Sequence, residues 1–111
     1  MEARLFLLQR LTAMILAPLV VVHLIVILIA VRGGLSAAEI QARTEGSVVW
    51  AVFYGLFVIC AAVHAPIGLR NVLREWTALG GRALDAAMAG FALVLALLGL
   101  RAVMAVTGGW I

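Results

Sequence analysis

The sequence predicts an all-α integral membrane protein, a bundle of three transmembrane helices with its N-terminus in the cytoplasm. Of its 111 residues, 67% are hydrophobic and only 12% are charged, about half the charged share of an ordinary soluble domain. A soluble domain this small cannot bury two thirds of its residues, because it has too much surface for its volume. The hydrophobic residues also fall into continuous runs. The composition therefore excludes soluble enzymes, disulfide-stapled secreted modules and disordered tails.

Three apolar runs, at residues 11–31, 48–69 and 83–106, are each long enough to cross a bilayer, which requires roughly 20 residues. They predict a single membrane domain that comprises all 111 residues. Between the first two runs, Ser36 and Glu39 have the spacing of a capping box. This spacing predicts a short additional helix on the membrane surface.

The charge of the connecting segments predicts the orientation, because basic residues favour the cytoplasmic side. The N-terminal segment and the link between the second and third runs carry five arginines: Arg4, Arg10, Arg70, Arg74 and Arg82. The link between the first two runs carries two arginines and two glutamates: Arg32, Arg43, Glu39 and Glu45. We therefore expect a cytoplasmic N-terminus. Because the arginines form no block, we interpret them as membrane-edge anchors and expect no nucleic-acid partner.

Side chains near the ends of the runs are typical of membrane interfaces. Arg101 lies about 8 Å from the end of its run, within reach of the headgroups, so we interpret it as a snorkelling anchor. Asp85 lies within a turn of the start of the same run, where a carboxylate suits the helix dipole and capping is the expected role. Four aromatic residues suit interfacial belts: Trp50, Tyr54, Trp76 and Trp110.

His64 is an ionisable residue inside a span, where such a side chain is energetically costly and usually has a function. Its imidazole is a good ligand for haem iron. Gly68 lies one turn further on the same face, where a missing side chain leaves room for a flat macrocycle. Arg70 lies about 9 Å further along the axis, where a haem propionate would require a cation. The alternative is a histidine hydrogen-bonded to a neighbouring helix, and the spacing alone leaves both interpretations open.

His23 is the second histidine inside a span. If both helices start at the same membrane face, His23 and His64 differ in depth by roughly 9 Å. Because one iron cannot bridge this offset, we expect the second ligand of a haem at His64 to come from another chain. A hydrogen bond across the bundle is the favoured role for His23, and a second haem or a proton relay are the alternatives.

The chain as a whole resembles the small three-helix cytochrome b anchor subunits of succinate dehydrogenase and fumarate reductase. Two segments carry the resemblance. The first is Gln9-Arg10-Leu11-Thr12-Ala13, which enters the first span. The second is His64-x-x-x-Gly68-x-Arg70-x-Val72-Leu73-x-Glu75-Trp76, which leaves the second span. The number, length and orientation of the predicted helices extend the resemblance over nearly the whole chain.

The resemblance implies roles for individual residues. In that family the histidine of the second helix is an axial ligand of haem b, which implies that His64 binds the haem iron, beside Gly68 and Arg70. An arginine at the start of the first helix and a nearby serine or threonine help to form the quinone pocket. By resemblance these residues are Arg10 and Thr12.

The end of the second motif departs from the family pattern. In one of the two anchor types, an acidic residue and then a tyrosine follow the histidine motif, and the tyrosine hydrogen-bonds the quinone. Glu75 and Trp76 occupy these positions here. Tryptophan has an N–H donor but no phenol, so Trp76 can hold a quinone oxygen but cannot pass it a proton. Since Arg70 resembles the other anchor type, the type stays open.

The resemblance further implies a multi-pass subunit of the bacterial inner (cytoplasmic) membrane, without a complete active site of its own. A flavoprotein subunit and an iron–sulfur subunit would dock on its arginine-bearing cytoplasmic edge. Electrons would then pass to quinone, with haem b close by. A second membrane-anchor chain, or a second copy of this chain, would complete the anchor.

Two alternatives to this reading have different chemistry. One is a small membrane scaffold, or an accessory subunit of a transporter, without a redox cofactor. The other is the anchor of a different quinone-linked oxidoreductase. Copurifying subunits separate the first alternative from the anchor reading, and substrate assays on the intact complex separate the second.

Overall fold

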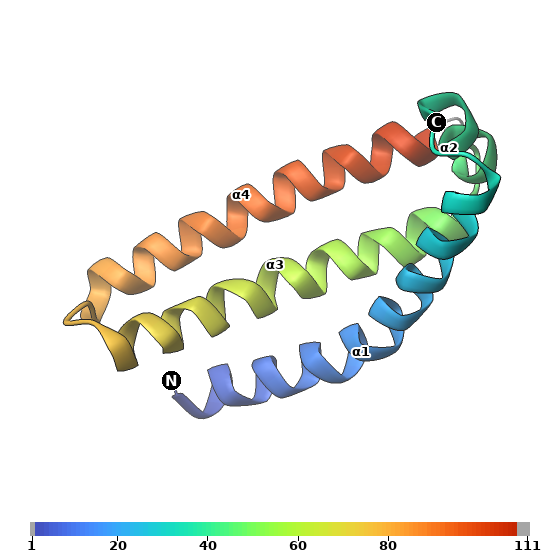
Figure 1. The fold of residues 1–111 in the computed structure, drawn as a ribbon. Helices are drawn as coiled ribbons and strands as arrows, with labels where there is room; N and C mark the ends of the chain where they lie inside the picture. Colours follow the sequence, from blue (N-terminus) through green and yellow to red (C-terminus); the bar gives the residue numbers. More distant parts are fainter. Residues whose placement is uncertain (1, 109–111) are drawn as a thin grey trace.

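The computed structural model describes residues 2–108 and contains four helices in that range. They are α1 (Glu2–Gly33), α2 (Ala37–Thr44), α3 (Val48–Trp76) and α4 (Gly81–Thr107) (Figure 1). Helices α1, α3 and α4 are long and apolar enough to cross a membrane. The predicted all-α fold with three spans is therefore confirmed.

Helix α3 lies between α1 and α4 and packs against both of them (Figure 1). The N-terminal end of α1 and the connection between α3 and α4 lie at one end of the bundle. Helix α2 lies at the other end, beside the last turns of α4. This arrangement brings both predicted arginine-rich segments to the same end. The orientation of that end in the membrane stays a prediction.

Two of the spanning helices extend well beyond the apolar runs. Helix α1 begins at Glu2 instead of residue 11, and α3 ends at Trp76 instead of residue 69. The extensions, residues 2–10 and 70–76, contain arginines and glutamates but no proline or glycine. Neither extension therefore contains a residue that stops a helix. Apolar runs therefore mark the segments suited to lipid, and α1 and α3 continue beyond those segments at the same end of the bundle.

The predicted capping box at the start of α2 is confirmed in its main contact. The Ser36 hydroxyl accepts a hydrogen bond from the Glu39 backbone N–H at 3.2 Å and donates one to Glu39 Oε1 at 2.7 Å. Gly34 precedes this turn with a φ of +122°, a conformation that disfavours any other residue. A side chain at Gly34 would also overlap the Glu39 carboxylate.

Helix α2 closes one end of the bundle by bonding to the last turn of α4. The Thr44 hydroxyl donates to the Val106 carbonyl at 2.6 Å, and the Gly46 N–H donates to the Thr107 carbonyl at 3.3 Å. Carbonyls at a helix C-terminus lack partners within their own helix. These bonds therefore satisfy groups that would otherwise be exposed near the membrane boundary.

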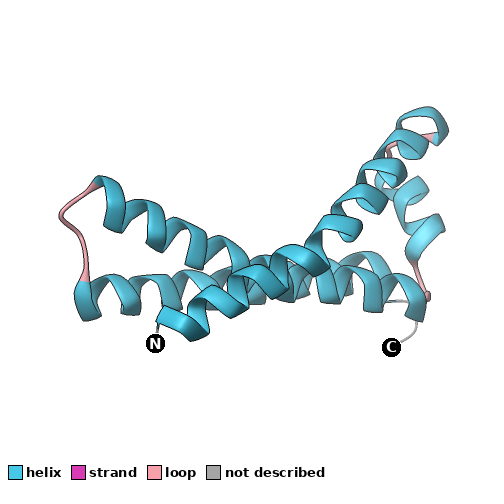
Figure 2. Cartoon of the chain, turned by 90° about the horizontal axis from the view of Figure 1, so that it is seen from below, coloured by secondary structure: helices cyan, strands magenta, loops and turns pink. Residues whose placement is uncertain are grey.

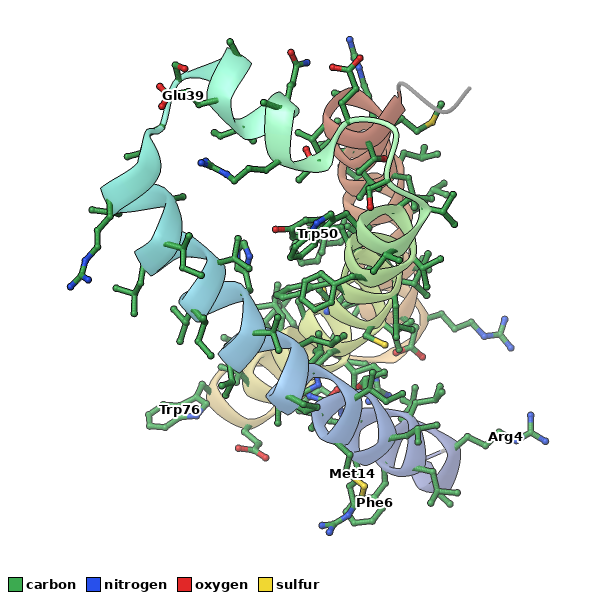
Figure 3. The ribbon with its side chains drawn as sticks, turned by 90° about the vertical axis from the view of Figure 1, so that its right-hand side faces the viewer. Arg4, Phe6, Met14, Glu39, Trp50 and Trp76 are labelled. Carbon is green, nitrogen blue, oxygen red and sulfur yellow. The ribbon has the colours of Figure 1, made fainter. Side chains whose placement is uncertain are left out.

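Helix α1 crosses α3 and then diverges from it (Figure 2). The divergence occurs in the half of the helix that follows Pro18, which lacks the N–H that would bond the Met14 carbonyl. Trp50 projects from α3 toward the space beside the divergent half (Figure 3), and its ring stacks on Tyr54 with centroids 5.6 Å apart. Both aromatics thus lie at the end of the bundle near α2. Trp110 lies outside the described residues.

Close packing of α3 on α4 depends on one glycine. A Cβ added at Gly99 would lie 2.4 Å from Val58 Cγ1, so only glycine permits this approach. At Gly55 and Gly90 an added Cβ would meet no atom of the described chain within 4 Å. Gly99 therefore serves the packing of α3 on α4, whereas Gly55 and Gly90 have no such role among the described residues.

Candidate functional site

His64 contacts α1 through a hydrogen bond to Thr12. The Nδ1 atom of His64 lies 3.2 Å from the Thr12 hydroxyl oxygen, and Thr12 is only 6% exposed. The same hydroxyl lies 2.7 Å from the Leu8 carbonyl and 3.1 Å from the Gln9 carbonyl. The interpretation of His64 as a histidine bonded to a neighbouring helix is therefore confirmed for one of its two ring nitrogens.

The second ring nitrogen of His64 is available to a ligand. Nε2 makes no hydrogen bond to any described residue, and it is absent from the set of fully buried atoms that lack partners. Nε2 is therefore not fully buried within the described chain. An imidazole held at Nδ1 with an accessible Nε2 has the donor set of an axial haem ligand. The two interpretations of His64 are thus compatible, because each one uses a different nitrogen.

Gly68 lies against Gln9 of α1. A Cβ added at Gly68 would lie 3.2 Å from the side-chain nitrogen of Gln9, closer than ordinary contact. The missing side chain therefore leaves room for the side-chain amide of Gln9 at this level. Its predicted place beside a haem stays a prediction.

Arg70 faces a different neighbour from His64. Its Nε donates to Asp85 Oδ1 at 2.7 Å, and Arg70 is only 8% exposed. Six residues at 3.6 per turn separate Arg70 from His64 by about 120° around α3. Arg70 and Asp85 both line a cavity of about 250 Å³ between α3 and α4. Arg70 is therefore held on α4, and its pairing with a haem propionate stays a prediction.

The expected capping role of Asp85 is wrong. Helix α4 begins at Gly81, its cap is Gly80 without a side-chain bond, and its first turn contains no acidic residue. Asp85 lies beyond that turn, and its carboxylate instead accepts a hydrogen bond from Arg70. Arg101 is exposed, as a snorkelling anchor would be.

The residues assigned to quinone are not brought together. Arg10 is exposed, and its guanidinium lies 5.7 Å from the centre of the Phe6 ring. Arg10 lines a cavity of about 700 Å³, whose described lining includes neither Thr12 nor Trp76. Trp76 is 81% exposed and projects outward from the end of α3 (Figure 3).

Two polar residues without an assigned role line the cavity beside Arg10. They are Gln9 of α1 and Asn71 of α3. The Oε1 atom of Gln9 is buried and lacks a hydrogen-bond partner within the described chain. Asn71 could have been identified from the sequence by its spacing. His64, Gly68 and Asn71 follow the i, i+4, i+7 pattern of one helix face.

His23 occupies a separate site near α2. Its ring packs edge-on against Tyr54 and Phe57, with centroids 5.8 and 5.4 Å away. Its Nδ1 is buried without a hydrogen-bond partner, so the hydrogen bond expected across the bundle is wrong for the residues described. Together with Val58 and Gly99, these three residues help to line a cavity of about 290 Å³.

The register of α1 on α3 sets the distance between the two histidines. Thr12 lies opposite His64, and His23 lies opposite Tyr54 and Phe57. These two residues precede His64 by ten and seven positions on α3, which corresponds to an offset of about 10–15 Å, close to or above the predicted 9 Å. A single iron cannot bridge this distance. Among residues 2–108 there is also no group of three His, Cys, Asp or Glu that could hold a metal by itself.

Comparison with known proteins identifies the type of chain that carries this arrangement. Residues 1–106 match the family of succinate dehydrogenase/fumarate reductase transmembrane subunits. No curated protein and no solved structure matches the chain. The match spans both sequence motifs and the three spanning helices, apart from Thr107 at the end of α4. The chain therefore belongs to the family of transmembrane subunits of succinate dehydrogenase and fumarate reductase.

Proposed function

We propose that this chain is a membrane-anchor subunit of a succinate:quinone oxidoreductase-type complex, which helps to bind haem b and quinone. The observation that carries the proposal is His64, whose Nδ1 is bonded within the bundle while its Nε2 is accessible. Membership of the family supports the association with flavoprotein and iron–sulfur subunits.

His64 is the residue that would hold the haem iron. When bound, haem b accepts and releases single electrons. The chain orients the imidazole through Thr12 and keeps it within a membrane span. Because His23 of α1 lies opposite Tyr54 and Phe57, about 10–15 Å along the bundle from His64, a second ligand for the iron would come from another chain, either a distinct anchor subunit or a second copy.

The cavity beside Arg10 is the place in this chain that suits a quinone. Its lining is mainly apolar, as a quinone ring and tail require, and it contains the polar side chains of Gln9, Arg10 and Asn71. Arginine and amide N–H groups can donate hydrogen bonds to the quinone oxygens. Thr12 and Trp76, assigned to the quinone from sequence, lie outside this lining, so their contact requires a partner chain or a different quinone position.

The arginine-bearing end of the bundle is the proposed docking surface for the soluble subunits. It carries four exposed arginines: Arg4, Arg10, Arg74 and Arg82. Arg70 was expected to contribute to this edge, but it is buried and bonded to Asp85. The positive-inside rule supports a cytoplasmic location for this end. The inner membrane of a bacterium stays the location that the resemblance implies.

The test is purification of the intact complex from detergent, with subunits and haem counted in the same sample. We expect a flavoprotein, an iron–sulfur protein and a reduced-minus-oxidised spectrum of haem b. His64→Ala should remove this spectrum, and the matched variant His23→Ala should retain it. Copurifying transporter subunits and a colourless complex would contradict the proposal.

A further inference from the structure

The contact between Thr12 and His64 determines which ring nitrogen carries a proton. We propose that Thr12 is a positioning residue that fixes His64 in the tautomer protonated at Nδ1, so that Nε2 keeps its lone pair for a metal. This inference rests on the proposed role of His64 in haem binding. It assigns Thr12 to the histidine instead of the quinone.

The hydroxyl of Thr12 has three neighbours but only one proton. A hydroxyl donates one hydrogen bond and accepts through two lone pairs. Two of its neighbours, the carbonyls of Leu8 and Gln9, can only accept, and they lie 2.7 and 3.1 Å away. The third neighbour, Nδ1 of His64, lies 3.2 Å away. The proton therefore goes to the nearer backbone carbonyls.

With its proton so placed, Thr12 can only accept from His64. Nδ1 must then carry a hydrogen, and a neutral imidazole has one hydrogen to place. Nε2 consequently retains its lone pair. The opposite arrangement, in which Thr12 donates to Nδ1, would leave a hydrogen on Nε2 and prevent it from binding iron. It would also withdraw the hydroxyl proton from its 2.7 Å contact with Leu8.

Burial of Thr12 stabilises the arrangement in which Nδ1 of His64 carries the hydrogen. Thr12 is 6% exposed, so water has little access to replace its hydroxyl. Threonine is stiff at χ1, and its back-bond to the helix holds the oxygen in one position. A histidine that binds a metal usually donates its other N–H to such a partner, which fixes the ring and raises its basicity.

The experiment compares Thr12→Val, which removes the hydroxyl at nearly equal volume, with Thr12→Ser, which retains it. The matched control is Thr44→Val, because Thr44 is 7% exposed and its hydroxyl also donates to i−4 and cross-helix carbonyls. Haem transfer from the purified complex to apomyoglobin measures haem affinity. Nitrogen NMR of histidine-labelled, haem-free full-length chain in micelles measures the tautomer, with His64→Ala providing the assignment.

We expect Thr12→Val to weaken haem binding by about 10- to 100-fold and to shift the haem potential upward, because the imidazole becomes less basic. Thr12→Ser and Thr44→Val should retain wild-type affinity and potential. Wild-type chain should show hydrogen on Nδ1 of His64, and Thr12→Val should show a mixture. Wild-type behaviour of Thr12→Val in both measurements, or an equal loss in Thr44→Val, would overturn the inference.

The two measurements also separate this inference from the proposed function. A wild-type complex without haem would end the haem role, yet the NMR spectrum of the full chain would still report the tautomer. A wild-type chain with hydrogen on Nε2 overturns the inference even if the complex contains haem. Haem lost with His64→Ala but unaffected by Thr12→Val would retain the function and remove the part assigned to Thr12.

Discussion

The Nε atom of Arg70 on α3 lies 2.7 Å from Oδ1 of Asp85 on α4. The sequence predicts separate roles for the two residues, with Arg70 beside a haem propionate and Asp85 as a helix cap. The fold instead pairs them. The arginine is nearly buried, whereas the Asp85 side chain is 39% exposed. The pair therefore joins α3 to α4 at the arginine-bearing end of the bundle.

Removing the carboxylate from this pair should destabilise the bundle. We expect Asp85→Asn to lower the free energy of unfolding by about 2 kcal/mol, since the asparagine oxygen can still accept from Arg70 but no longer supplies a negative charge to the buried arginine. The double variant Arg70→Met/Asp85→Asn should lose less than the sum of the two single variants. Thermal unfolding of the purified chain in detergent provides the measurement, and strictly additive losses would contradict the pairing.

Enlarging Gly99 should force α3 and α4 apart. We expect Gly99→Ala to cost about 1–3 kcal/mol, because its Cβ would lie 2.4 Å from Val58 Cγ1. Gly90→Ala is the matched control, since its Cβ meets no described atom within 4 Å and alanine favours a helix. Adding Val58→Ala to Gly99→Ala should restore part of the loss. Equal unfolding temperatures for the two glycine variants would show that the close approach is absent.

Replacing His23 with phenylalanine should be tolerated. The residue packs by its ring and makes no hydrogen bond to the described chain at Nδ1, so a phenylalanine keeps the contacts with Tyr54 and Phe57. We expect an unfolding temperature equal to or above that of the wild type and an unchanged number of haems per complex. A loss of haem in His23→Phe would show instead that this histidine binds a second one.

The orientation of the bundle can be tested with single cysteines. Cys60 is buried and should react slowly, so a Cys60→Ala background removes a minor signal. In that background we expect Ala3→Cys to react with a membrane-impermeant maleimide only from the cytoplasmic side. Ala38→Cys on α2 should react only from the opposite side, because α2 lies at the other end of the bundle. The reverse pattern would invert the topology and move the arginine-bearing end away from the cytoplasm.

The spans and the start of α2 could be predicted from the sequence, because both are local properties. Continuous apolar runs located the three spans, and Ser36 with Glu39 located the start of α2. The extensions of α1 and α3 were not predicted, because hydrophobicity reports suitability for lipid and not the end of a helix.

Contacts between helices depend on register and rotation, which apolar runs do not encode. His64 was recognised from its position inside a span, but its partner Thr12 lies 52 residues away and required the register of α1 on α3. The pairing of Arg70 with Asp85 depends on the rotation of α3 toward α4. Spacing along one helix placed Arg70 at the right height for a haem at His64, while the fold turns it toward another helix.

The position of α3 between the other two spans has an energetic consequence. One side of this helix carries His64 toward α1, and another carries Arg70 toward α4. Residues without shared neighbours contribute independently to the free energy of unfolding. The losses of unfolding free energy caused by substitutions at Thr12 and at Asp85 should therefore add. Residues on the α1 side of α3 can then change during evolution without compensating changes on the α4 side.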